Sequence, residues 1–377
     1  MRRIDDIEVL RAIAVIFVVF QHIENLFPWR VLLLESIKLY IGGSFGVDLF
    51  FAVSGFVIAR DLIPRLRDSP NQAKVIKIML AFWLRRIWRL WPTAWIWLGI
   101  ILIAVVTFNT SGSFGTLEAN LKATYAGVFH YANIRFLQTF MISEYGVSFV
   151  YWSLSLEEQF YLLFPLMVIV FKKRIFWVLL AIILIQLVLP RSNLYFLMFR
   201  TDALALGILL AIWSSKTSWN SLQSIFSKLG RSGCFILVFL LIATMARLSG
   251  SSSVTPYYIS IIALLSFLLV LMASYDSNFV MQKSRLKSSL VWIGEHSYSI
   301  YVIHIPVFFA TREIFYRIYP EQMSGTTLNF VYLMFALFTL WLLSYMNFRF
   351  IEVPFRNYGT TASLRILQSQ DAAIKNT

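Results

Sequence analysis

Ten apolar runs, most of them roughly 17 to 25 residues long, follow one another along this chain and leave it few ways to fold. Hydrophobic residues make up 59% of the chain and charged residues only 14%. A soluble domain carries about 25% charged residues. Backbone polar groups in lipid need internal partners, so such runs form helices. We predict an all-α, polytopic transmembrane helical bundle of about ten spans, near 7–27, 43–63, 79–107, 151–171, 175–190, 195–213, 233–248, 256–274, 289–310 and 328–348.

The third run differs from the others because arginines stand inside its first turns. Arg85, Arg86 and Arg89 precede Trp91 and Pro92. Charged side chains prefer the interface to the hydrocarbon, so we expect this run to begin as an interfacial helix and to enter the membrane after Pro92.

Basic residues are distributed unevenly between alternate connections. The side that holds the N-terminus collects nineteen Lys and Arg residues in the connections and termini, against seven on the other side. Because cytoplasmic loops are enriched in Lys and Arg, both termini are predicted to be cytoplasmic. Anchoring to anionic membrane lipid also explains the net charge of +14, so no nucleic acid is expected as a partner.

One membrane domain, residues 1–358, accounts for nearly the whole chain, and residues 359–377 are expected to form a short, polar cytoplasmic tail. Asp5 and Asp6 precede the first run and Glu8 stands at its start, which is unlike a cleavable signal peptide. The single Cys234 excludes an internal disulfide. The longest connection, 109–150, is predicted to lie outside and to cover a site at the outer surface.

Arg11 and His22 lie within the first run, eleven positions apart. An eleven-residue step in a helix returns to within about 20° of the same face and rises roughly 16 Å. Both side chains should therefore look into one side of the bundle at opposite depths. Ionisable residues within a span are costly, so this pair marks a functional site.

Arginines gather at the predicted inner depth. Arg86 and Arg89 are three residues apart and share a helix face, near the depth of Arg11. Guanidinium groups bind phosphate oxygens in a bidentate manner, so this cluster suits an anionic ligand that carries phosphates. Simple positive-inside anchoring is the alternative for any one of these arginines.

A second group of titratable residues is predicted at the outer depth: His22, Asp48, Glu157 and Glu158. Histidine exchanges a proton near neutral pH, and a carboxylate can orient its ring, so the group can deprotonate an acceptor hydroxyl. A helix-to-helix hydrogen bond is the structural alternative for the histidine. For the two glutamates the alternative is capping of a helix N-terminus.

Other polar residues carry weaker signals. Arg200 and Asp202 could form an ion pair within the membrane, and a structural role and a functional role are both open for this pair. His296 and His304 lie roughly on one helix face, but no third metal ligand has suitable spacing, so no metal site is predicted. His130, in the outer connection, is expected to be solvated.

Two functions of different class fit these residues. One is an enzyme that uses an anionic cytoplasmic donor and a hydroxyl acceptor at the outer face. The other is a proton-coupled secondary transporter of a sugar or an organic anion. Transporters of that kind commonly contain inverted repeats and broken helices, which the sequence does not display. Polar clusters of opposite type at opposite depths favour group transfer.

Six segments, taken in order, resemble acyltransferase family 3, a family of integral-membrane O-acyltransferases that act on bacterial surface polysaccharides and related glycans. They are the Arg11-to-His22 pair, Gly46-Val-Asp-Leu-Phe-Phe-Ala-Val-Ser-Gly-Phe, Arg86-Ile-Trp-Arg, Trp152-Ser-Leu-Ser-Leu-Glu-Glu-Gln-Phe-Tyr, Ser297-Tyr-Ser-Ile-Tyr-Val-Ile-His and Phe350-Ile-Glu-Val-Pro-Phe-Arg. The resemblance covers nearly the whole chain. It implies a multi-pass protein of the bacterial cytoplasmic (inner) membrane.

The resemblance also implies roles for individual residues. Arg11, Arg86 and Arg89 are expected to bind acyl-CoA, with acetyl-CoA as the expected donor. His22 is expected to activate a glycan hydroxyl, supported by Asp48 or Glu157, and an acyl-histidine intermediate is an open alternative. Acceptor binding is assigned to Trp152, Glu158 and His304. Members often carry an extra periplasmic hydrolase-like domain, so here we expect the membrane domain or a separate partner to complete the transfer. Whether the chain forms a homo-oligomer is left open.

Overall fold

The computed structural model describes residues 3–189, 193–252, 257–319 and 326–368. Within these ranges every regular element is a helix, as predicted. Arg191, Lys375 and the part of the expected tail after residue 368 lie outside the described residues. The helices belong to two compact units, each assembled from two separate stretches of the chain.

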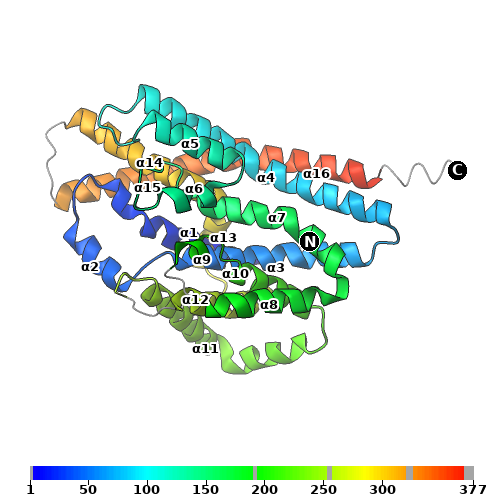
Figure 1. Ribbon diagram of the computed structural model, residues 1–377. Coiled ribbons are helices and arrows are strands. Elements are labelled where there is room, and N and C mark those ends of the chain that lie inside the picture. The colour runs from blue at the N-terminus through cyan, green and yellow to red at the C-terminus, as the bar shows by residue number, and fades with distance from the viewer. Residues whose placement is uncertain (1–2, 190–192, 253–256, 320–325, 369–377) are drawn as a thin grey trace. The chain divides into compact units, whose positions relative to one another are not determined.

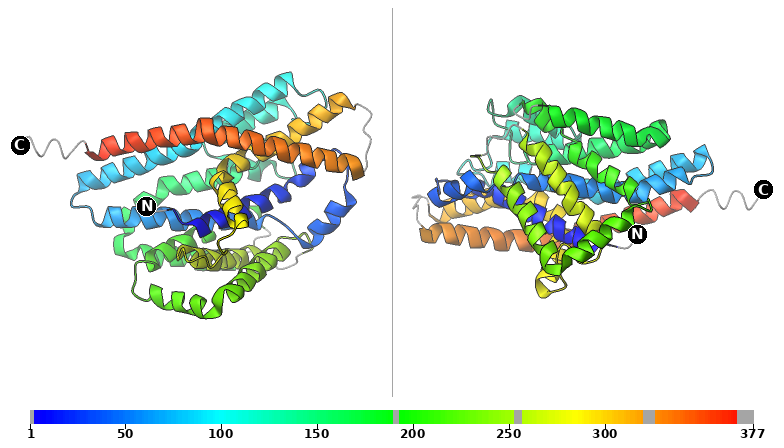
Figure 2. Two further views of the ribbon diagram at one scale, coloured as in Figure 1. Left: turned by 180° about the vertical axis from the view of Figure 1, so that it is seen from behind. Right: turned by 90° about the horizontal axis from the view of Figure 1, so that it is seen from below.

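Unit 1 contains residues Met1–Asp61 and Lys173–Tyr301. Its helices are α1 (Asp5–Gln21), α2 (Leu32–Tyr40), most of α3 (Phe45–Arg67), α8 (Ile175–Val188), α9 (Leu194–Met198), α10 (Asp202–Trp213), α11 (Trp219–Leu248), α12 (Tyr258–Ser274) and α13 (Arg285–Glu295). A 3-10 turn, Ile23–Leu26, follows α1. Helix α10 packs against α8 and α12, and α13 packs against α1 (Figure 2).

Unit 2 contains residues Leu62–Lys172 and Val302–Thr377. Its helices are α4 (Gln72–Thr107), α5 (Leu117–Val128), α6 (Ala132–Thr139), α7 (Tyr151–Phe171), most of α14 (Ser297–Ile318), α15 (Thr326–Asn347) and α16 (Val353–Gln368), with a π-helical turn at Phe348–Glu352. Helices α4 and α16 lie side by side along most of the length of α16 (Figure 1).

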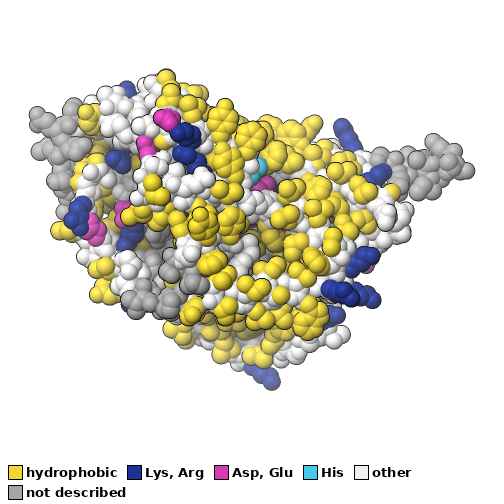
Figure 3. Space-filling view, viewed as in Figure 1, with side chains coloured by type: hydrophobic (Ala, Val, Ile, Leu, Met, Phe, Trp, Pro, Cys, Tyr) yellow, Lys and Arg dark blue, Asp and Glu magenta, His cyan; other side chains and the backbone are white. Residues whose placement is uncertain are grey.

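Every predicted span overlaps a helix, although several bounds differ. Four helical stretches are long and apolar enough to cross a membrane: Gln72–Thr107, Leu194–Trp213, Trp219–Leu248 and Leu328–Gln368. Helices α2 and α3, bent by 51°, form a fifth candidate if they are counted as one broken span. Apolar side chains also dominate the face in Figure 3, as expected for a surface in contact with lipid.

Two local predictions about helix bounds were wrong, and a third is not tested by the structure. Helix α4 runs without interruption through Pro92, so the arginines and the apolar run belong to one helix, and the interfacial position of its first turns stays a prediction. The predicted span 289–310 is divided, because α13 ends at Glu295 and a new helix begins at Ser297. Residues 359–368, expected to belong to a short polar tail, instead form the C-terminal part of α16.

Aromatic packing explains why α16 is helical. The ring of Trp88 on α4 stacks on Phe355, with ring centroids 5.6 Å apart, and meets Tyr358 edge-on at 4.6 Å. A Cβ atom on Gly359 would lie 2.5 Å from the Cβ of Trp88, so only glycine allows this approach. These contacts hold α16 against α4 although its sequence is polar.

Helices α5 and α6 form a hairpin that turns back along α4 and α7 (Figure 1). Gly127, near the end of α5, lies against Leu98 of α4 and Tyr151 of α7. At the tip, the backbone carbonyl of His130 accepts a hydrogen bond of 2.8 Å from Gln159. Gln159 stands eight residues into α7, so the tip lies about 12 Å along that helix from its first residue. The long connection therefore contains a helical hairpin that packs along α4 and α7.

Candidate functional site

The end of α1 and the start of α3 are held in close contact by glycines. A Cβ atom on Gly43 would lie 1.8 Å from the carbonyl oxygen of Phe17, and one on Gly46 would lie 2.4 Å from that of Ala14. The side chain of Gln21 also accepts a hydrogen bond of 2.7 Å from the Gly43 N–H. His22 follows directly after α1, so the contact brings its end of α1 to the first turn of α3.

Asp48, in that first turn of α3, forms a buried ion pair with Arg200. The Arg200 Nε donates to Asp48 Oδ1 at 2.8 Å, and Nη2 donates to Oδ2 at 3.2 Å. Both residues are less than 5% exposed. This pairing differs from the sequence hypothesis that paired Arg200 with Asp202, whose Oδ1 accepts from the N–H of Ala203 at 3.1 Å. Asp48 therefore ties α3 to the segment that leads into α10.

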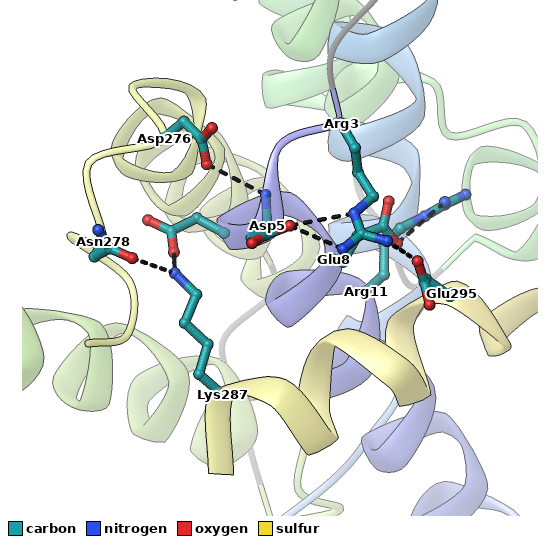
Figure 4. A network of polar contacts seen from close by, with 9 residues as sticks. Arg3, Asp5, Glu8, Arg11, Asp276, Asn278, Lys287 and Glu295 are labelled. Carbon is teal, nitrogen blue, oxygen red and sulfur yellow. Dashed lines mark hydrogen bonds and ion pairs between the residues drawn. The ribbon is translucent and has the colours of Figure 1, made fainter. Parts of the chain in front are cut away.

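Arg11 lies within a polar network at the N-terminal end of α1 (Figure 4). Its Nη1 is 3.6 Å from Glu8 Oε2, one helical turn earlier. The first turn of α1 is fixed from outside by the buried pair between Asp6 and Lys287 of α13. A Cβ atom on Gly294 would lie 2.0 Å from the Glu8 carbonyl oxygen, so α13 and α1 approach each other closely at this turn.

The arginines predicted at the inner depth stand on α4 and face different neighbours. The Arg86 guanidinium lies over the rings of Phe82 and Tyr161, at 5.5 and 5.2 Å from their centroids. Arg89 follows one turn later and is half-buried. Arg85 Nη1 instead donates to the Ser363 hydroxyl of α16 at 3.5 Å. Arg86 is therefore directed toward α7, and Arg85 toward α16.

The two predicted glutamates join this arginine in one cluster within unit 2. The Tyr161 hydroxyl donates to Glu157, and the Trp91 indole N–H donates to Glu158 at 3.4 Å. We call Arg86, Trp91, Glu157, Glu158 and Tyr161 the α4–α7 polar cluster. Sequence reasoning placed the glutamates at the opening of α7, but they stand two turns inside it. Arg86, predicted at the inner depth, and the two glutamates, predicted at the outer depth, are thus closer together than the sequence suggested.

His130 was expected to be solvated, and that expectation was wrong. The residue sits at the tip of the α5–α6 hairpin with a positive φ of 56°. Its ring packs against Trp91 with centroids 5.0 Å apart. Burial lowers the pKa of its imidazole below the ordinary value, so the neutral form is favoured. No sequence pattern indicated this position, because it depends on how the hairpin folds back.

The remaining predicted residues lie elsewhere in the two units. Trp152 packs against Phe136 of α6 at 6.3 Å, and the fully buried His304 meets Phe308 edge-on at 6.0 Å. His296 Nδ1 lies 2.7 Å from the Trp292 carbonyl oxygen. Among the described residues no group of His, Cys, Asp and Glu could hold a metal ion.

The candidate residues therefore divide between the units. Unit 1 carries Arg11, His22 and Asp48, while unit 2 carries Arg86, Arg89, Trp152, Glu157, Glu158 and His304. Sequence reasoning missed Trp91 and Tyr161 as partners of the glutamates. Tyr161 ends the Trp152-to-Tyr161 segment, four residues after Glu157, and that spacing places the two on one helix face.

Several helices are long and apolar enough to cross a membrane, and a buried charged pair lies among the helices of unit 1, as is typical of a membrane protein. The acyltransferase domain model matches residues 4–346, and this chain belongs to that acyltransferase family.

Curated relatives agree with the family. The chain is 25% identical over 394 residues to the peptidoglycan O-acetyltransferase OatA of Listeria monocytogenes, a match that covers 94% of this chain and 56% of the relative. It is 28% identical over 388 residues to the O-acetyltransferase OatA of Staphylococcus aureus, covering 96% and 58%. The chain thus spans a little over half the length of these relatives. No solved structure matches it.

Proposed function

We propose that this protein is an O-acetyltransferase that moves an acetyl group from cytoplasmic acetyl-CoA to a hydroxyl of a cell-surface or lipid-linked glycan. The family match over residues 4–346, together with relatives named O-acetyltransferases, is the observation that carries the proposal. In the reaction the hydroxyl oxygen attacks the thioester carbon. A C–O ester bond forms, the C–S bond breaks, and the hydroxyl proton is finally taken by the CoA thiolate.

Chemical roles follow from residue type. Arg86 and Arg89 carry guanidinium groups on neighbouring turns of α4, which suits the phosphates of the donor. Arg11 is a third cation for the donor, and its pairing with Glu8 orients the guanidinium. His22 acts as general base toward the acceptor hydroxyl. Glu158 and Trp152 bind the acceptor, and His304 is assigned there by family resemblance alone.

Donor binding is tested by Arg86→Ala and Arg89→Ala. Losing one charge-assisted hydrogen bond costs about 1.5 to 3 kcal/mol, so the affinity for acetyl-CoA should fall roughly ten- to a hundredfold in either variant. Isothermal titration of the purified protein with acetyl-CoA measures this. Arg85→Ala is the matched control, since Arg85 stands on the same helix but donates to Ser363. If all three variants bind acetyl-CoA as tightly as the wild-type protein does, Arg86 and Arg89 serve lipid anchoring instead.

In the proposed topology, ten spans cross a bacterial inner membrane and both termini lie in the cytoplasm. Cys234 is the only cysteine and is buried, so a Cys234→Ser background permits single-cysteine labelling. A membrane-impermeant maleimide should label Lys122→Cys in intact spheroplasts, because the exposed Lys122 lies on the outer hairpin. Asp68→Cys, exposed after α3, should react only once the membrane is opened. Labelling of both from outside contradicts the topology.

A further inference from the structure

We propose that the tip of the α5–α6 hairpin forms an acceptor subsite, in which the His130 imidazole and the Glu158 carboxylate bind the hydroxyls of one pyranose unit beside the aromatic faces of Trp91 and Trp95. This inference rests on the proposed function, and it adds a residue that neither the sequence motifs nor the family resemblance indicated. All four residues belong to unit 2.

The geometry of the tip is fixed from two sides. The His130 backbone carbonyl accepts from Gln159 Nε2, and the Gln159 side chain also exchanges hydrogen bonds with the Asn133 amide, at 2.9 and 3.3 Å. The Ala132 N–H donates to the Ser155 hydroxyl at 3.2 Å. A non-glycine residue in the left-handed region is held at some cost in conformational energy. The surrounding bonds therefore hold the imidazole at one defined place.

His130 has hydrogen-bonding capacity that the protein does not use. Within the part of the chain that the structure describes, its imidazole makes no hydrogen bond, and Nε2 is buried without a partner. A buried polar atom without a partner costs about 1 to 3 kcal/mol. A ligand hydroxyl that reaches this ring recovers that cost.

A carboxyl group and aromatic surface lie next to the ring. Trp91 packs against His130 with the two rings tilted by 34°, and it donates its indole N–H to Glu158, so one side chain links the imidazole to the carboxyl group. Trp95 stacks on Trp91 at 5.1 Å and is 41% exposed, which extends the aromatic surface along α4. Aromatic faces with a few convergent polar groups are typical of small-ligand sites.

The surroundings argue for a polar ligand rather than lipid. The face in Figure 3 is largely apolar, whereas His130 and Glu158 are both partly exposed. Polar groups at such a face cost free energy against hydrocarbon, so a polar partner is expected there. A pyranose offers hydroxyls for both groups and an apolar ring face for the indoles.

The test is a kinetic comparison with radiolabelled acetyl-CoA as donor and chemically de-O-acetylated peptidoglycan fragments as acceptor. His130→Asn keeps a residue that tolerates positive φ and removes the imidazole. We expect KM for the acceptor to rise about five- to tenfold, with KM for acetyl-CoA and the melting temperature unchanged. Glu158→Gln should likewise raise the acceptor KM. Met141→Asn is the matched control, because Met141 also has positive φ but is 90% exposed.

Each outcome decides between the possibilities. If His130→Asn changes neither KM, or lowers the melting temperature with no selective rise in acceptor KM, the residue only packs and the inference is wrong. His130→Gly, which relieves the backbone strain, replaces the asparagine variant if that protein does not fold. If the wild-type protein transfers no acetyl group to these fragments yet binds acetyl-CoA, the subsite is wrong for this sugar class. Absence of acetyl-CoA binding instead contradicts the proposed function.

Discussion

His22→Ala is expected to lower acetyl transfer at least about a hundredfold while leaving the protein folded and able to bind acetyl-CoA. A hundredfold is the lower range for general acid–base catalysis. Alanine should preserve the fold, because His22 follows the last residue of α1 and its backbone N–H already bonds to the Val18 carbonyl at 3.3 Å. Transfer assays and acetyl-CoA titration of the purified variant separate chemistry from binding.

His304→Ala provides the comparison for this result. His304 is fully buried, so its replacement leaves a cavity and should lower stability more than it lowers the turnover of the molecules that remain folded. Near-normal transfer by His22→Ala would make His22 a structural residue, although the family assignment would stand.

Arg200→Ala is expected to destabilise the protein by about 3 to 5 kcal/mol, because it leaves the Asp48 carboxylate buried and without its guanidinium partner. Asp48→Asn should also destabilise, and the double variant Asp48→Asn/Arg200→Gln should lose less than the sum of the two single changes. Thermal unfolding in detergent, followed by size-exclusion chromatography, measures all three.

The same variants test whether Asp48 has the catalytic role suggested by the sequence. If the ion pair only joins α3 to the start of α10, each variant should lower the amount of folded protein and leave the activity per folded molecule unchanged. If Asp48→Asn abolished transfer by well-folded protein while Arg200→Ala retained it, Asp48 would act on His22 or the acceptor directly.

Helix positions were largely predictable because lipid restricts an apolar run to one secondary structure. Helix α7 matches its predicted range, and α15 lies within two residues of its own. The errors arose where tertiary contacts override composition. The polar α16 is helical because Trp88 and Gly359 pack it against α4, and that contact joins residues far apart in the sequence.

The candidate site was only partly predictable, for a similar reason. Motif spacing identified Glu157 and Glu158 but not their partners. The Asp48–Arg200 pair joins residues 152 positions apart, a separation at which helical periodicity gives no information. His130 was misjudged because a connection rich in Gly, Ser and Thr resembles a solvated loop, whereas α5 and α6 fold back along α4 and α7.

The central claim is acetyl transfer from CoA to a glycan hydroxyl, and the most direct measurement uses the purified protein in proteoliposomes with radiolabelled acetyl-CoA and de-O-acetylated peptidoglycan fragments. The account predicts alkali-labile label on the glycan, with release of an equal amount of CoA thiol, and loss of both in His22→Ala. Proton-driven uptake of sugar into the proteoliposomes without ester formation or thiol release would contradict it and favour the transporter.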